Sequence, residues 1–159
     1  MKILVVSDTH GAIFESIVKP IREEKDIDLM IHCGDKYKDA EKLAWLLGIK
    51  DFYRVTGNCD YDIENRKDML IQVIGGKQVL ITHGHLQNVK DDLNHLKKLA
   101  DENHTDIVLY GHTHIAHEEL CNDVLYFNPG STIMPKYGKP SYGIIEIMPD
   151  KILSRIVCL

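Results

Sequence analysis

Five apolar segments of this chain each end in a short step that contains glycine and carries aspartate, asparagine or histidine. They are VVSDTHG (5–11), IHCGD (31–35), VTGNCD (55–60), ITHGH (81–85) and LYGHTH (109–114). Short apolar runs bounded by turn residues are typical of buried strands. The carboxyl ends of strands in α/β sheets line one edge, where ligand sites form. The polar residues of these five steps are therefore predicted to converge, although they lie more than 100 positions apart.

The segments between these strands alternate between helical and β patterns. Residues 13–21 have apolar side chains, Phe14 among them, at helical spacing, with Pro20 near the end, and residues 88–102 repeat that spacing. Residues 70–85 resemble a hairpin that turns at Gly75-Gly76, and the chain after residue 120 is rich in β patterns, with a turn predicted at 128–130. Without a linker, repeat or low-complexity segment, we expect a single α/β domain over 1–159, with helices covering a central pair of mixed sheets.

Composition excludes several classes of protein. The 159 residues are 44% hydrophobic and 27% charged, which is typical of a globular protein, and no apolar run is long enough for a membrane helix. The N-terminus lacks the pattern of a signal peptide, and the four cysteines are scattered, so we expect a cytoplasmic protein with reduced thiols. The net charge of −5 argues against an extended nucleic-acid surface.

Seven side chains at the strand ends are candidate metal ligands. They combine carboxylate, amide and imidazole donors without a thiolate, which suits Mn²⁺, Fe²⁺ or Zn²⁺. Seven donors exceed what one such ion takes from protein when positions stay open for water and substrate, and two ions that share a bridging carboxylate fit the number. The candidates are Asp8, His10, Asp35, Asn58, His83, His112 and His114.

The ordered motifs D-x-H, G-D, G-N-x-D, H-G-H and G-H-T-H resemble those of the calcineurin-like metallophosphoesterases. The small size, the GNCD variant and NPGS at 128–131 resemble the YfcE-type phosphodiesterase branch. This resemblance implies an αββα fold, a β-sandwich of two mixed sheets flanked by helices. It also implies two divalent ions, with Mn²⁺ favoured and Ni²⁺, Fe²⁺, Co²⁺ and Zn²⁺ as alternatives. The first ion would be held by Asp8, His10 and His114, the second by Asn58, His83 and His112, and Asp35 would bridge them.

The implied activity is hydrolysis of a small phosphate ester, most of all a diester, through a metal-bridging hydroxide. The candidate catalytic residues are Asp35, Asn58 and Cys59. Many relatives carry histidine at the position of Cys59, near the substrate. A thiol is a weaker hydrogen-bond donor than an imidazolium, so we hypothesise that this chain favours diesters and handles ordinary monoesters poorly. The role of Asp60, which has no imidazole to orient, stays open.

Other interpretations remain for parts of the site and for the whole chain. Taken singly, Asp8 would cap a helix, and Asp35 and Asn58 would form turns. His32 is predicted to be a hydrogen-bonded structural residue, and His117 to be solvated. For the whole chain, the alternatives are a non-catalytic metal-binding or protein-interaction scaffold of the retromer-subunit type, and a nuclease. The resemblance also allows for a homodimer.

Overall fold

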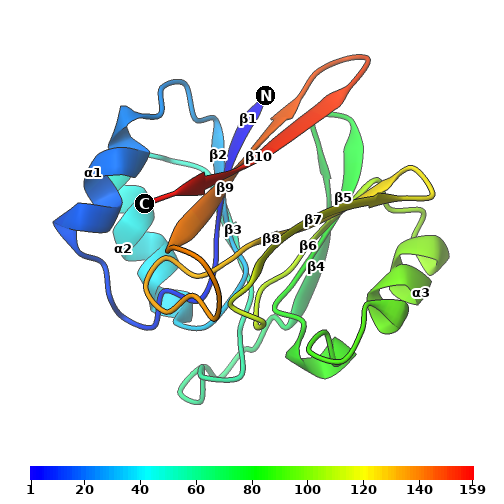
Figure 1. Ribbon diagram of the computed structural model, residues 1–159, viewed down its shortest axis with the longest axis horizontal. Helices are drawn as coiled ribbons and strands as arrows, with labels where there is room; N and C mark the ends of the chain where they lie inside the picture. The colour runs from blue at the N-terminus through cyan, green and yellow to red at the C-terminus, as the bar shows by residue number, and fades with distance from the viewer.

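The computed structural model describes residues 1–159 and contains two five-stranded sheets (Figure 1). The first sheet has the strand order β10-β9-β1-β2-β3. Strands β1, β2 and β3 run parallel to one another, whereas β9 is antiparallel to both β1 and β10. Its strands are β1 (Lys2–Val6), β2 (Leu29–His32), β3 (Phe52–Arg54), β9 (Ser141–Ile147) and β10 (Ile152–Cys158).

The second sheet has the order β4-β5-β6-β8-β7. Strands β5, β6 and β8 are parallel, and the edge strands β4 and β7 are antiparallel to their neighbours. Its strands are β4 (Met69–Ile74), β5 (Lys77–Thr82), β6 (Ile107–Leu109), β7 (Ala116–Cys121) and β8 (Val124–Pro129). The pairing of Ile74 with Lys77 confirms the hairpin predicted through Gly75-Gly76.

The two sheets pack face to face, and the helices cover their outer faces (Figure 1). Helices α1 (Glu15–Glu23) and α2 (Tyr37–Leu47) lie on the first sheet, and α3 (Asn94–Glu102) lies on the second. A short 3-10 helix, η1 (His85–Gln87), follows β5. The expected β-sandwich of two mixed sheets flanked by helices is confirmed. None of these helices is both long and apolar enough to cross a membrane.

Strand β1 shows why the sequence of a central strand is apolar throughout. Ile3 and Val5 point into the core between the sheets, whereas Leu4 and Val6 point into the cluster beneath α1 and α2. Successive side chains of a strand alternate between its faces, and here both faces are covered. The burial of both faces fixes the end of β1, and with it the position of Asp8.

Three details differ from the expectations. Phe14 is the extended residue before α1 and is 56% exposed, so it does not belong to the buried helical face. The helix predicted from residue 88 begins only at Asn94, and the chain before it forms turns, in which Asn88 has a left-handed backbone with φ 53°. Asn128 and Pro129 are the last residues of β8 rather than turn residues.

Candidate metal centre

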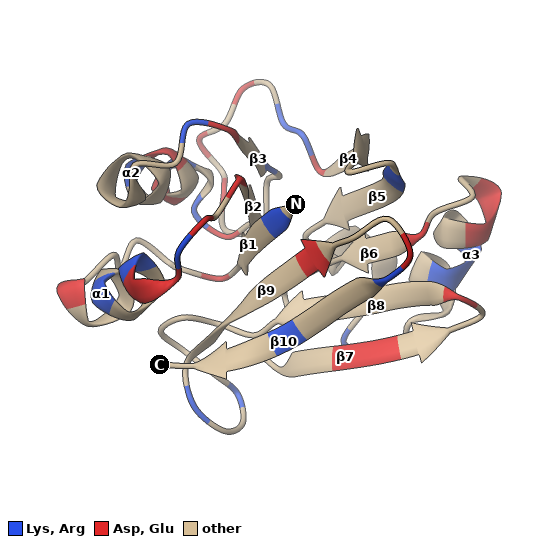
Figure 2. Cartoon of the chain, turned by 90° about the horizontal axis from the view of Figure 1, so that it is seen from above, with Lys and Arg blue, Asp and Glu red and all other residues tan.

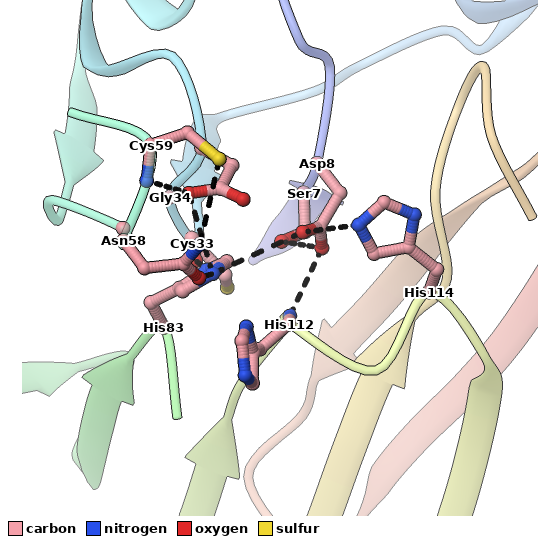
Figure 3. Close-up of polar contacts among 12 residues, drawn as sticks. Ser7, Asp8, Cys33, Gly34, Asn58, Cys59, His83, His112 and His114 are labelled. Atoms are coloured by element: carbon pink, nitrogen blue, oxygen red, sulfur yellow. Dashed lines mark hydrogen bonds and ion pairs between the residues drawn. The ribbon is translucent and has the colours of Figure 1, made fainter. Parts of the chain in front are cut away.

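The seven predicted donors lie together where strands of both sheets end (Figure 3). Asp8 and His10 follow β1, Asp35 follows β2, and Asn58 comes after β3. From the second sheet, His83 follows β5, and His112 and His114 come after β6. The predicted convergence of strand ends is therefore seen in the fold.

Four of the donors form one compact group. Asp8, His10, Asp35 and His114 each direct a ligand atom into a space in which these atoms lie within 4.8 Å of one another. His114 Nε2 lies 3.2 Å from both Asp8 Oδ1 and His10 Nε2. His10 Nε2 is also 3.8 Å from Asp35 Oδ2. This geometry matches the group expected to hold the first ion.

The remaining donors gather on the other side of Asp35. His83 Nε2 lies 3.1 Å from Asn58 Oδ1 and 3.4 Å from Asp35 Oδ1. The ring of His112 is centred 5.0 Å from that of His83. Asp35 thus presents one carboxylate oxygen to each group, which is the position that a bridging ligand needs.

Backbone carbonyls orient two of the imidazoles. His83 Nδ1 lies 2.8 Å from the carbonyl oxygen of Cys33, and His114 Nδ1 lies 2.7 Å from that of Met134. A carbonyl only accepts hydrogen bonds, so each Nδ1 must carry the proton. In the neutral imidazole the Nε2 lone pair then faces the donor group, as in histidines that bind metals.

Asp8 supplies a direct test of whether a cation fits this site. Its carboxylate is completely buried, and Oδ2 accepts hydrogen bonds from Ser7 Oγ at 2.6 Å and from the His112 N–H at 3.1 Å. Oδ1 is also buried but accepts no hydrogen bond, although His114 Nε2 lies nearby. A buried, unpaired anionic oxygen is costly unless a cation compensates it. Together with the donor chemistry, this orphaned oxygen fits a divalent ion.

The backbone at the site is unusual as well. Five of the seven donors, namely Asp8, His10, Asp35, His112 and His114, have left-handed φ angles between 47° and 67°. Residues other than glycine rarely adopt this conformation, which persists where surrounding structure enforces it. The turns at the strand ends are therefore held in positions that aim these side chains toward one another.

The electrostatics of the donors reflect two buried carboxylates beside imidazoles. Burial acts to raise the pKa of Asp8 and Asp35, but His114 and His83 outweigh it, so both pKa values lie below the usual range. Burial acts to lower the pKa of His83, yet the carboxylates raise it, and they also raise that of His114. His112 behaves differently, because burial and the neighbouring His83 lower its pKa to about 4. The carboxylates thus create a field that favours positive charge between them.

Glycines in the motifs allow the strand ends to approach so closely. A Cβ atom at Gly57 would collide with the carboxylate of Asp35, and one at Gly111 would collide with Ser7 Oγ. Even alanine would therefore push the candidate ligands apart. Close approach of backbone to functional groups is a position where glycine is required.

Asp60 is a supporting residue whose role the sequence did not reveal. It is 2% exposed, and Oδ1 accepts hydrogen bonds from the backbone N–H groups of Lys36 and Tyr37 at 3.1 and 2.8 Å. Its Oδ2 accepts from the N–H of Gly57 at 2.8 Å. Asp60 therefore connects the segment that carries Asn58 to the segment that carries Asp35. Its position two residues after Asn58 was the only signal in the sequence.

The NPGS segment supports the site from the second sheet. Asn128 Nδ2 donates to the Gly111 carbonyl at 2.9 Å and to Thr113 Oγ1 at 3.0 Å, which holds the turn between His112 and His114. Ser131 Oγ donates to the Asp8 carbonyl at 2.8 Å. The segment therefore borders the candidate metal centre through its supporting hydrogen bonds.

Cys59 and the other histidines have distinct surroundings. The Cys59 N–H donates to Asp35 Oδ1 at 2.9 Å, and burial together with Asp35 raises the pKa of its thiol to about 11. His32 is completely buried and hydrogen-bonded, which confirms its structural role. The side chain of His117, expected to be solvated, is 41% exposed, and its Nδ1 also lies 2.8 Å from the hydroxyl of Tyr110.

Comparisons with known proteins agree with this architecture. Residues 1–150 match the calcineurin-like phosphoesterase superfamily domain, so the chain belongs to this family and the resemblance of its motifs is confirmed. The probable metallophosphoesterase YsnB of Bacillus subtilis is 36% identical over 156 residues, which cover 98% of this chain and 89% of YsnB. A phosphodiesterase of Methanocaldococcus jannaschii is 32% identical over 92% of this chain and 93% of its own length. Phosphodiesterase YfcE of Escherichia coli is 37% identical over 58% of this chain and 50% of YfcE.

Two solved structures share the fold. A predicted phosphoesterase from Streptococcus pneumoniae superposes with a TM-score of 0.82 at 27% identity, over 99% of this chain and 88% of that protein. Vps29 from Entamoeba histolytica, in complex with Zn²⁺, superposes with a TM-score of 0.79 at 20% identity, over 99% of this chain and 98% of Vps29. The second likeness concerns the fold alone.

Proposed function

We propose that this chain is a phosphodiesterase that holds two divalent ions, with Mn²⁺ favoured, and hydrolyses a small phosphate diester. The observation that carries this proposal is the buried Asp8 Oδ1, which lacks a hydrogen bond and faces imidazole nitrogens. The diester preference is supported by relatives named as phosphodiesterases. When bound, the ions would supply Lewis acidity and an activated water molecule at the phosphate.

Each donor has a role in this proposal. Asp35 would bridge the two ions through its carboxylate, and Asn58 would contribute a neutral oxygen that adds no negative charge to the second position. The Cys33 and Met134 carbonyls hold the rings of His83 and His114 in their ligating orientation. Asp8, His10 and His114 hold the first ion, and Asn58, His83 and His112 the second.

Cys59 has a secondary role beside Asp35. Because its pKa is raised to about 11, the thiol stays protonated at neutral pH and carries no charge toward the phosphate. Asn58 Nδ2 lies 3.4 Å from Cys59 Sγ, which keeps the two side chains in contact. A neutral, weak donor at this position suits a monoanionic diester better than a dianionic monoester, which needs more positive charge around it.

Further features belong to the same proposal. We infer a single domain over 1–159 and a cytoplasmic location. The substrate is a small molecule rather than nucleic acid, since basic and acidic segments are interspersed over the helices (Figure 2). From the family resemblance we also expect the chain to form a homodimer.

The second candidate function is the binding scaffold of the retromer-subunit type that the sequence also allows. All seven donors are present here in one cluster, which a scaffold would not need for protein contacts alone. A chain that binds no divalent ion, and whose biological role survives loss of Asp35, would fit the scaffold better.

Hydrolysis assays test the proposed function. Protein stripped of metal and reloaded with Mn²⁺ is expected to hydrolyse bis-p-nitrophenyl phosphate faster than p-nitrophenyl phosphate. Asp35→Asn should lower kcat/KM at least about a hundredfold, because the bridge loses its charge. Asp150→Asn, an exposed change in the turn between β9 and β10, is the matched control and should retain full activity. Failure of the wild-type protein with Mn²⁺, Ni²⁺, Co²⁺, Fe²⁺ and Zn²⁺ would contradict the proposal.

A further inference from the structure

A cavity of about 230 Å³ lies beside the candidate metal centre, on the side of the second sheet. Its walls include the apolar side chains of Val89, Leu93 and Ile115. The volume is below the roughly 300 Å³ at which pockets for drug-sized ligands begin, so it suits a group about the size of one ring.

Three contacts connect the cavity to the metal centre. Thr113 lines the cavity and lies between His112 and His114 in the chain. The N–H of Lys136, another lining residue, donates to the His114 carbonyl at 2.9 Å. Val89 packs closely against Gly84, the residue after His83. The cavity therefore shares its wall with segments that carry three of the candidate ligands.

The polar side chains of the cavity are suited to an anion. Lys90 and Lys136 line it, none of its lining residues is acidic, and neither lysine forms an ion pair within the chain. The loop that leads into β9 carries basic segments (Figure 2). Two uncompensated ammonium groups beside an apolar wall are notable in a chain of net charge −5. They would attract an anionic group and hold it in place.

Tyr110 and His117 add polar atoms to the wall of the cavity. Tyr110 is buried, and its hydroxyl lies 2.8 Å from His117 Nδ1. His117 Nε2 lies 3.9 Å from Glu119 Oε2, too far for a hydrogen bond, and remains available to a ligand.

We propose that this cavity receives one arm of the phosphodiester, and that this arm is a single ring or short apolar chain ending in a carboxylate or phosphate. Val89, Leu93 and Ile115 would contact the apolar part, and Lys90, Lys136 and His117 the anionic end. This inference rests on the proposed function, because it concerns the substrate of that site.

The first test measures binding without metal or catalysis. Phenylphosphonate, a ring with an anionic group, is added to EDTA-treated protein with labelled methyl groups and followed by NMR. We expect chemical-shift changes at Val89, Leu93 and Ile115. Lys90→Ala and Lys136→Ala should each weaken binding about fivefold, whereas Lys139→Ala, an exposed lysine of the same loop, should have little effect. Shift changes confined to other residues, or equal affinity in all variants, would overturn the proposal.

The second test separates this inference from the proposed function. With Mn²⁺-loaded enzyme, 4-nitrophenyl 4-carboxyphenyl phosphate should have a lower KM than 4-nitrophenyl phenyl phosphate, and Lys90→Ala with Lys136→Ala should abolish that difference. Hydrolysis of both diesters with no difference in KM would overturn the cavity proposal and leave the activity intact. Absence of hydrolysis, with phenylphosphonate still bound at the cavity, would instead contradict the proposed function and support the cavity as an anion site.

Discussion

At the scale of single residues, Cys59 is the position where this chain departs from the histidine of many relatives. Its thiol lies beside Asp35 and has a pKa raised to about 11, so it carries no charge at neutral pH. An imidazole at this position could carry a positive charge and donate a stronger hydrogen bond. The charge at position 59 should therefore influence which phosphate ester is accepted.

Cys59→His is expected to raise kcat/KM for p-nitrophenyl phosphate about tenfold or more, because a charged donor contributes roughly 1.5–3 kcal/mol to a hydrogen bond. The change for bis-p-nitrophenyl phosphate should be smaller, so the diester-to-monoester ratio should fall. Cys121→His, at a half-buried thiol far along the chain in β7, controls for an added imidazole. An unchanged diester-to-monoester ratio would show that Cys59 does not determine this specificity.

His32 is a residue whose neutral form the fold requires. The Gly34 N–H donates to Nδ1, so the proton lies on Nε2, which donates to Thr9 Oγ1. Thr9 in turn donates to Asp39 Oδ2, which also accepts from the Gly11 N–H. Burial lowers the pKa of His32 to about 4 from 6.5. This network joins the ends of β1 and β2 to α2.

The pH dependence of stability follows from that shift. The unfolded chain binds a proton at His32 below pH 6.5, but the folded chain does so only near pH 4, so acid favours unfolding. The contribution to the free energy of unfolding should fall by about 3 kcal/mol across this window. Urea unfolding of metal-free wild type and His32→Gln, measured from pH 7.5 to 4, should show the steeper acid loss in the wild type. Parallel curves would contradict this prediction.

At the scale of elements, the turns after the strands are held by side chains from other turns. Asp60 binds backbone N–H groups at the start of α2 and at Gly57, and Asn128 at the end of β8 holds the turn of His112 and His114. Such supporting contacts keep ligands oriented and affect metal affinity about as strongly as some ligands do.

Asp60→Ala should therefore show what the loss of a supporting residue does while all seven candidate ligands remain. Loss of a buried carboxylate that accepts three backbone hydrogen bonds should lower the free energy of unfolding by about 2–4 kcal/mol. Mn²⁺ affinity should fall about 10–100-fold, with the number of bound ions unchanged. Urea unfolding and metal binding by calorimetry measure the two effects, and Asp62→Ala at an exposed aspartate is the control. Unchanged affinity would show that Asp60 only stabilises the fold.

At the scale of the whole molecule, each donor group takes side chains from both sheets. Asp8 and His10 follow a strand of the first sheet and meet His114 of the second, while Asn58 of the first meets His83 of the second. A bound ion would therefore connect the two halves of the sandwich. Metal binding would therefore be coupled to global stability in this architecture.

Mn²⁺ should raise the free energy of unfolding by about 2.7 kcal/mol for each site at a hundredfold excess over Kd. Thermal or urea unfolding with and without Mn²⁺ measures this gain, and Asp35→Asn should lose most of it. Mg²⁺, a harder ion that prefers oxygen ligands, should stabilise less than Mn²⁺ at a site rich in imidazole. Equal stabilisation by both ions would point to non-specific binding.

The sequence predicted the donors because strand ends in α/β sheets share an edge, and the hairpin because Gly75-Gly76 is a strong turn signal. It did not predict the carbonyls of Cys33 and Met134, because backbone partners carry no residue-specific signal. The sequence also did not predict the cavity beside the centre. Its lining residues Val89, Tyr110 and Lys136 become neighbours only when the loop before α3 and the loop before β9 pack together. Contacts that form only through tertiary packing cannot be predicted from the local sequence pattern.

The most direct measurement of the central claim is a titration of metal-free protein with Mn²⁺, in which bound metal and hydrolysis of bis-p-nitrophenyl phosphate are followed together. Two ions that share Asp35 should give an activity that stays low through the first equivalent, rises as the second binds, and levels off at two ions per chain. A plateau at one equivalent, or two bound ions without hydrolysis, would contradict a dinuclear phosphodiesterase.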